Sequence, residues 1–349
     1  MLAARWHARR DVRVEEIAEP GAPPPGWVRL RVDACGICGT DVEEYQLGPV
    51  LVPTAPHPLS HRSAPLTLGH EPSATVEAVG DGVALRPGTR VAVETNLHCG
   101  ECWWCRRGDT QLCTQLASLG LMGDGALAEL MLAPASMCAP LSDSVPAAHG
   151  ALAEPLSVAV RAARRGGVLA GSTVGIVGGG TVGLLLLQVA LRRGASQVVV
   201  VDRVESRRAL ASQLGAAAAV TPEEASQAAL DLTGGVGLDV TVEAAGNSRA
   251  AMAAISLARR GGRSVLLGVY DDVVPLSMLD MLMGEREVVA SLSHTFAEDF
   301  VEAVRMIDAG AVQLDPLITD RIPLRRVVED GFTPLIDEPM RHLKIIVEP

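Results

Sequence analysis

The chain has 349 residues, of which 48% are apolar and 20% charged, and its formal net charge is -11. This length is long for a single core and predicts two domains. The acidic balance and the absence of a basic stripe exclude a nucleic-acid footprint. The N-terminal stretch MLAARWHARRDVRVEE has no apolar signal core, and the apolar runs are too short to span a bilayer. We expect a soluble, cytoplasmic protein with no nucleic-acid or membrane partner.

Residues 1–150 are predicted to form short strands that are separated by turns. The segments VRLRVDAC, ATVEAVG and RVAVET are rich in β-branched residues. Residues 46–66 carry five prolines, and we expect them to form an ordered loop. The first part of the chain is therefore expected to be β-rich.

Beyond residue 150, short valine-rich runs alternate with helical stretches. STVGIVG precedes the helical GTVGLLLLQVALRRG, SQVVVVD precedes ESRRALASQLG, and further strands are expected at LDVTVEAAG and RSVLLGV. Apolar strands that alternate with helices are typical of a parallel, doubly wound sheet covered on both faces. The tail is expected to hold a helix within EDFVEAVRMIDAG and a closing strand at LKIIVEP.

The first of these strand–helix units contains a dinucleotide-binding motif. Gly178, Gly180 and Gly183 have the G-x-G-x-x-G spacing between a strand and a helix, where they allow a tight turn, close approach of a pyrophosphate and close helix–strand packing. Asp202 ends the next strand, where a carboxylate would bind a ribose 2′-hydroxyl and repel a 2′-phosphate. The glycine motif, the helix and Asp202 stand at the expected spacing, which favours a functional NAD site over an empty structural domain. The neighbouring arginines could bind a 2′-phosphate, so NADP remains an alternative cofactor. The predicted cofactor contacts are Gly178, Gly180, Thr181, Val182, Gly183, Asp202, Arg203 and Arg207.

Four of the seven cysteines lie within one polar segment. Cys99, Cys102, Cys105 and Cys113 follow C-x2-C-x2-C-x7-C, a spacing that four unrelated thiols would not produce. In a reducing compartment, clustered cysteines bind metals more often than they form disulfides. Four thiolates close a tetrahedral zinc shell and leave no open position, so this zinc would be structural. The metal would replace the apolar core that the segment lacks.

A second set of ligand types is spread over three segments. Cys38 lies in ACGICGTD, His70 and Glu71 lie in TLGHEPS, and Glu154 lies in LAEPLSV. A thiolate, an imidazole and a carboxylate with one open position suit a catalytic zinc. Because a His-Glu pair alone is usually a surface or packing feature, the prediction depends on all three segments.

These motifs make the chain resemble the zinc-dependent medium-chain dehydrogenases of the alcohol dehydrogenase superfamily, in the sorbitol and 2,3-butanediol dehydrogenase branch. CGICGTD, LGHE, the four-cysteine segment, AEPLSVAV and VGGGTVG occur in the family's order, and EEYQLGPVLVP and DPLITDRIPL match butanediol dehydrogenases. The resemblance implies an α/β fold with a GroES-like β-rich catalytic domain and a Rossmann doubly wound parallel-sheet coenzyme domain. The implied boundaries are 1–155 for the catalytic domain with a zinc lobe at 99–113, 156–290 for the NAD-binding domain, and 291–349 for a return to the catalytic domain.

The resemblance also implies the roles of the second set of ligands. Cys38 and His70 would bind the catalytic zinc, Glu71 would be the third protein position, often through water, and Glu154 would enter or leave the shell. Cys35 is expected to pack beside them without binding metal. A homodimer or homotetramer is implied as well.

A proton relay is implied next to this zinc, with one departure from the family pattern. Thr40 would hydrogen-bond the substrate oxygen and pass its proton outward. The family usually has a histidine three residues later, where this chain has Glu43, and Arg161 also stands where relatives commonly have a histidine. Glu43 is either the outer end of the relay or a solvated surface acid.

We therefore predict an enzyme with NAD and two Zn²⁺ ions per chain that oxidises a secondary alcohol reversibly. The substrate class would be a polyol, a vicinal diol or a cyclitol. Two alternatives remain open: a zinc- and NAD(P)H-dependent reductase or tailoring enzyme for a specialised metabolite, and a non-catalytic NAD-binding zinc protein. The joint presence of the predicted zinc ligands and Thr40 argues against the non-catalytic alternative.

Overall fold

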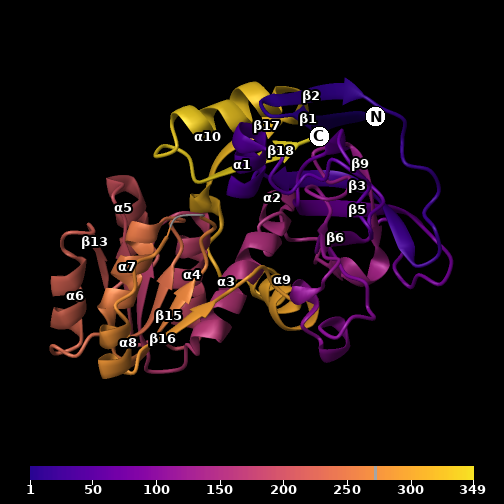
Figure 1. Ribbon diagram of the computed structural model, residues 1–349. Coiled ribbons are helices and arrows are strands. Elements are labelled where there is room, and N and C mark those ends of the chain that lie inside the picture. Colours follow the sequence, from indigo (N-terminus) through magenta and orange to yellow (C-terminus); the bar gives the residue numbers. More distant parts are fainter. Residues whose placement is uncertain (271–272) are drawn as a thin grey trace. The chain divides into compact units, whose positions relative to one another are not determined.

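The structure is a computed structural model that describes residues 1–270 and 273–349 (Figure 1). The chain divides into two compact units. The first comprises Met1–Glu154, Thr295–Gly310 and Leu317–Pro349, and the second comprises Pro155–His294 and Ala311–Pro316. Both the β-rich first unit and the parallel sheet of the second confirm the predicted fold class.

The first unit is built on two larger sheets and one two-stranded antiparallel sheet. A three-stranded sheet has the order β2-β1-β4, and a seven-stranded sheet has the order β10-β6-β5-β3-β18-β17, with β9 paired to β3. The strands are β1 (Leu2–Ala8), β2 (Asp11–Glu16), β3 (Trp27–Gly36), β4 (Leu66–Thr67), β5 (Glu71–Val79), β6 (Arg90–Val93), β7 (Asn96–Leu97), β8 (Ala117–Ser118), β9 (Leu130–Pro134), β10 (Cys138–Pro140), β17 (Ile318–Pro323) and β18 (Lys344–Glu348). Its helices are α1 (Gly39–Leu47), α2 (Ala147–Gly150), α9 (Val301–Asp308) and α10 (Thr333–Asp337).

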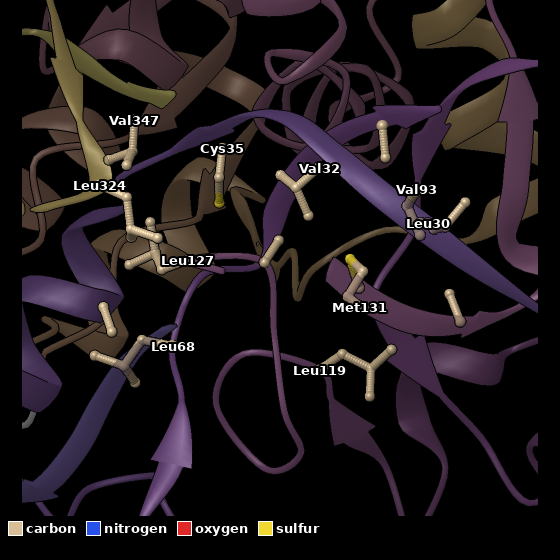
Figure 2. Close-up of a cluster of buried hydrophobic side chains, with 14 of the residues drawn as sticks. Leu30, Val32, Cys35, Leu68, Val93, Leu119, Leu127, Met131, Leu324 and Val347 are labelled. Atoms are coloured by element: carbon tan, nitrogen blue, oxygen red, sulfur yellow. The ribbon is translucent and has the colours of Figure 1, made fainter. Parts of the chain in front are cut away.

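The hydrophobic core of this unit follows from alternation along β3. Val28, Leu30 and Val32 point inward and are buried, while the arginines between them face outward. The C-terminal strand β18 pairs antiparallel with β3, so that Val347 lies opposite Cys35. Figure 2 shows Val347 and Cys35 in one buried cluster with side chains from the middle of the chain. The tail therefore completes the core that the N-terminal strands begin.

The second unit contains a six-stranded parallel sheet of order β13-β12-β11-β14-β15-β16. Its strands are β11 (Thr173–Val177), β12 (Gln197–Val201), β13 (Ala218–Val220), β14 (Leu238–Glu243), β15 (Ala258–Leu266) and β16 (Glu287–Ala290). The helices are α4 (Thr181–Arg192), α5 (Glu205–Gln213), α6 (Ala225–Leu232), α7 (Ser248–Leu257) and α8 (Met278–Gly284), while α3 (Ala153–Gly166) runs from one unit into the other. The order reverses at β11, and ligands of doubly wound folds bind outside the carboxyl ends of the strands at such a point.

The valine-rich strands and the two helices that were expected after them are confirmed at β11, α4, β12 and α5. The prolines between α1 and β4 lie in a segment without helix or strand, as the sequence predicts. The short strands β13 and β16 were not predicted from the sequence, because three or four residues are too few to show the alternation of apolar and polar side chains that marks a strand. In the part of the chain that the structure describes, no helix is both long and apolar enough to cross a membrane.

Candidate functional site

The glycine-rich loop joins β11 to α4 in the second unit. A Cβ on Gly183 would lie 1.9 Å from the carbonyl oxygen of Gly178, so the helix can approach the strand only with glycine there. A Cβ on Gly180 would meet no atom within 4 Å, which leaves the start of the helix open to a ligand. Thr181 and Val182 begin α4 directly after it. The loop thus presents the N-terminus of a twelve-residue helix, a favourable place for phosphate.

Asp202 lies at the end of β12 and is held beside this loop. Its Oδ2 atom accepts a hydrogen bond of 2.7 Å from the backbone N–H of Gly179. The guanidinium of Arg207 lies 4.0 Å from the same oxygen, whereas Arg203 is exposed. Arg208, which sequence analysis did not single out, donates to the backbone oxygen of Asp202 at 2.9 Å. The carboxylate therefore has a defined position next to the loop, with cations beside it.

The four-cysteine lobe brings its thiols into one cluster. The Sγ atoms of Cys99, Cys102, Cys105 and Cys113 all lie within 4.8 Å of one another, with separations of 3.9 Å for Cys99–Cys105 and 3.5 Å for Cys102–Cys105. A tetrahedral shell with Zn–S bonds of about 2.3 Å places its sulfurs roughly 3.8 Å apart, whereas a disulfide needs about 2.05 Å. Backbone N–H groups lower the pKa of Cys102 to about 6, and burial raises that of Cys105 to about 12. The donor set fits a four-coordinate metal.

A second cluster lies in the first unit at the start of α1 and β5. The ligand atoms of Cys38, His70 and Glu71 lie within 4.8 Å of one another. Asp41 is fully buried, accepts from the backbone N–H of Cys38 at 2.9 Å, and lies 3.3 Å from Nδ1 of His70. Burial alone would lower the pKa of His70, but Asp41 and Cys38 raise it well above its usual range. Asp41 therefore orients the imidazole, a role that carboxylates have behind metal-bound histidines.

Glu71 has a second partner, which the sequence motifs did not predict. Lys344 Nζ donates to both carboxylate oxygens of Glu71 at 2.7 and 2.6 Å, and to the carbonyl oxygen of Ile37 at 2.8 Å. Burial lowers the pKa of Lys344, but Glu71 and Cys38 more than offset it, so the ammonium stays charged. The signal in the sequence was that Lys344 is the only lysine of the chain.

Glu154 lies in the first turn of α3 and is half-buried. Among the described residues, it is not part of the group within 4.8 Å that Cys38, His70 and Glu71 form. Loss of solvent raises its pKa to about 7, with Glu71 and Asp41 adding to the rise, while His70 and Lys344 oppose it. The charges of the cluster therefore change the pKa of Glu154, although Glu154 lies outside the cluster.

Glu94 is a further buried carboxyl that sequence analysis missed. Burial and the charge of Glu154 raise its pKa to about 8, although a hydrogen bond from Asn96 opposes this. Two neighbouring carboxyls with raised pKa values hold a proton at neutral pH, and their titrations belong to the pair. An inward-facing glutamate directly after strand β6 was the available signal.

The two predicted relay residues lie on α1. Thr40 Oγ1 is 3.7 Å from the Sγ atom of Cys38, and Glu43 follows three residues later, so both occupy one helix face. Both side chains are half-buried. Cys35, in contrast, is fully buried among apolar side chains and directs its thiol toward the carbonyl oxygen of Gly36 at 3.5 Å (Figure 2). Its thiol pKa is raised by burial, so it remains protonated in the core.

Comparison with known proteins covers the whole chain. The alcohol dehydrogenase GroES-like domain family matches residues 24–143, and the zinc-binding dehydrogenase family matches residues 181–309. Human sorbitol dehydrogenase is 34% identical over 93% of this chain and 89% of its own length. The crystal structure of 2R,3R-butanediol dehydrogenase from Bacillus subtilis is 33% identical, with a TM-score of 0.92 over 100% of this chain and 99% of that one. A zinc-binding dehydrogenase from Sinorhizobium meliloti bound to NADP is 31% identical, with a TM-score of 0.89 over 100% and 99%.

Proposed function

Because the chain belongs to the zinc-binding dehydrogenases with an alcohol dehydrogenase GroES-like domain, we propose that it oxidises a secondary alcohol of a polyol, vicinal diol or cyclitol reversibly. It is an oxidoreductase of the zinc-dependent branch that includes butanediol and sorbitol dehydrogenases. The observation that carries the proposal is the cluster of Cys38, His70 and Glu71 within 4.8 Å, in a chain that spans such relatives from end to end.

The alternatives from the sequence are not favoured. A specialised reductase or tailoring enzyme would share the fold, but butanediol and sorbitol dehydrogenases are among the similar proteins, each at least 33% identical. A non-catalytic NAD-binding protein would have no use for a thiol, an imidazole and a nearby threonine hydroxyl in one cluster.

Two Zn²⁺ ions per chain are part of the proposal. Cys38 and His70 would hold the catalytic ion, Glu71 and Glu154 would be its optional carboxylate ligands, and the cysteines of the four-cysteine lobe would hold the structural one. When bound, zinc supplies Lewis-acid activation of the substrate oxygen and NAD supplies the hydride acceptor. Asp41 would keep the imidazole of His70 in the orientation that the ion needs.

The chain's own residues would remove the proton that alcohol oxidation releases. Thr40 would accept the substrate hydroxyl proton at Oγ1 and pass its own proton outward along α1, to Glu43 or to water. The position of Thr40 next to Cys38 supports this path, and the shared helix face of Thr40 and Glu43 supports Glu43 as the acceptor.

NAD is proposed as the preferred cofactor because the Asp202 carboxylate stands beside the glycine-rich loop and would repel a 2′-phosphate. The guanidinium of Arg207 lies 4.0 Å from Asp202 and could bind a 2′-phosphate, so the enzyme would also accept NADP, with slower turnover than with NAD. We further propose a cytoplasmic homodimer or homotetramer, with catalytic segments over residues 1–155 and 291–349 and the NAD-binding domain over 156–290.

A substrate panel tests the proposal. Purified protein with its metal content measured is incubated with NAD and vicinal diols, polyols and cyclitols, and NADH absorbance is recorded. Thr40→Val and Glu43→Gln should each slow oxidation by roughly 10²-fold, the lower end for general acid–base catalysis. The matched control is Glu16→Gln, an exposed acid on β2, which should leave the rate unchanged. Absence of turnover with every alcohol would refute the function, and an unaffected Glu43→Gln enzyme would leave Thr40 and water as the proton path.

A further inference from the structure

Glu243, the last residue of β14, is a buried acid that neither the proposed zinc sites nor the glycine motif uses. It has no exposed surface. Its Oε1 atom accepts hydrogen bonds from the backbone N–H groups of Ala245 at 2.7 Å and Gly246 at 2.6 Å, and its Oε2 atom accepts from the N–H of Gly268 at 3.1 Å. An acid is seldom fully buried unless its oxygens are paired. This side chain therefore fixes a defined set of backbone groups.

The three hydrogen bonds join two segments that follow neighbouring strands of the parallel sheet. Ala245 and Gly246 come directly after β14, and Gly268 comes directly after the end of β15 and Leu267. The N–H of Leu267 also donates to the backbone oxygen of Glu243 at 3.1 Å. A Cβ on Gly268 would lie 2.6 Å from the Cα atom of Gly246 and 2.6 Å from Oε2 of Glu243. The two segments therefore meet backbone to backbone, with Glu243 as the tie between them.

The segment after β14 also touches the glycine-rich loop. A Cβ on Gly178 would lie 2.7 Å from the carbonyl carbon of Ala244 and 2.8 Å from the nitrogen of Ala245, and the N–H of Ala244 donates to the backbone oxygen of Val177 at 2.8 Å. Strands β11, β14 and β15 are consecutive neighbours in the sheet. The segments that follow these three strands therefore form one continuous edge at their carboxyl ends.

The proposed cofactor contacts set the direction in which a dinucleotide would cross this edge. Asp202, at the end of β12, would bind the adenosine ribose, and the N-terminus of α4, after β11, would bind the pyrophosphate. Because β12 and β14 lie on opposite sides of β11, the nicotinamide half would continue over the ends of β14 and β15. Neighbouring strands lie about 4.8 Å apart, so both ends are within reach of that half.

We infer that Glu243 is a positioning residue for the nicotinamide half of the cofactor. By holding the N–H groups of Ala245, Gly246 and Gly268, it sets the spacing between the two backbone segments that this half would contact. Since Glu243 is fully buried, it acts through these segments and does not touch the cofactor itself. The inference rests on the proposed NAD function and assigns to that site a residue outside the glycine motif.

Glu243→Gln tests the inference because it breaks one bond and keeps the others. The amide oxygen can still accept from Ala245 and Gly246, but the amide nitrogen would face the N–H of Gly268, donor against donor. Calorimetric titration of zinc-loaded protein gives the dissociation constants of NAD and of ADP, which has the adenosine and both phosphates but lacks the nicotinamide half. The variant should bind NAD roughly 10-fold more weakly, as expected when one hydrogen bond that shapes the site is lost, and should bind ADP as the wild type does.

A second variant and a matched control separate this role from a general loss of stability. Gly268→Ala disturbs the same contact from the other side, because its methyl group would press on Gly246 and Glu243, and it should give the same selective loss of NAD binding. Asp239→Asn is the control at the opposite end of β14, where Asp239 accepts from the backbone N–H of Thr173 at 2.8 Å and from its hydroxyl at 2.9 Å. It should lower the melting temperature without changing either dissociation constant.

The outcomes distinguish this inference from the proposed function. Equal weakening of NAD and ADP binding in the Glu243 and Gly268 variants would overturn it, because Glu243 would then support the whole sheet edge, and so would unchanged binding of both ligands. A wild type that binds neither ligand refutes the NAD proposal and the inference together. Selective loss of NAD binding in a protein that oxidises no alcohol of the panel would uphold the inference and refute only the alcohol dehydrogenase function.

Discussion

Replacing Lys344 by methionine, which has a similar length but no charge, should strongly destabilise the first unit. The Lys344 ammonium lies 2.6 Å from a Glu71 oxygen, and the two side chains keep only 4% and 1% of their surface exposed. Removing one partner of a buried ion pair costs about 3–5 kcal/mol because the other charge stays buried without compensation. For a unit of this size, that corresponds to roughly 10 °C in melting temperature.

A metal at the Cys38–His70–Glu71 cluster changes the size of this effect. In the structure, both Glu71 oxygens are occupied by Lys344. Once Lys344 is gone, the Glu71 carboxylate is free to ligate zinc, which would neutralise it. We therefore expect Lys344→Met to lose more stability in zinc-free protein than in zinc-loaded protein.

Calorimetric melting with and without zinc measures both expectations. The series contains the wild type, Lys344→Met, Glu71→Gln and the double variant, in which no unpaired charge remains and most of the stability should return. Arg341→Met, at an exposed position near the same strand, is the matched control and should stay within about 0.5 kcal/mol of the wild type. A zinc-free Lys344→Met protein that melts within two or so degrees of the wild type would refute the reasoning, because Glu71 would then not depend on this cation.

Three further changes test the sites separately. Cys105→Ser should lower the metal content by one ion per chain and reduce thermal stability, as elemental analysis and melting would show, whereas unchanged metal content would rule out its role as a ligand. Asp202→Ala should reduce the preference for NAD, measured as kcat/KM with NAD divided by kcat/KM with NADP, by roughly 10-fold, because the hydrogen bond between the carboxylate and the ribose 2′-hydroxyl is lost. A wild type that prefers NADP would contradict the prediction. Glu94 has a pKa raised to about 8, so its neutral form stabilises the fold at low pH and that contribution disappears as pH rises toward 8. Glu94→Gln should therefore gain stability relative to the wild type between about pH 5 and pH 8, and parallel pH profiles would argue against a raised pKa.

The motifs that lie within a few residues of one another were predictable from the sequence alone. The glycine loop, the cysteine spacing and the strand–helix order of β11, α4, β12 and α5 depend on short-range geometry and on periodic burial, both of which are written in consecutive residues. The resemblance to a known family extended this to a site that is assembled from Cys38, His70 and Glu71.

Only the tertiary structure decided the partners of these residues. Lys344 reaches Glu71 across 273 positions of sequence, because β18 pairs with β3 and β3 pairs with β5. Asp41 meets His70 across 29 positions in the same way. Such contacts depend on which strands become neighbours, a choice made by the burial of the whole core, and no local pattern encodes it. The charges that control the proposed metal site are therefore set by the fold, while the identities of its candidate ligands are visible in the sequence.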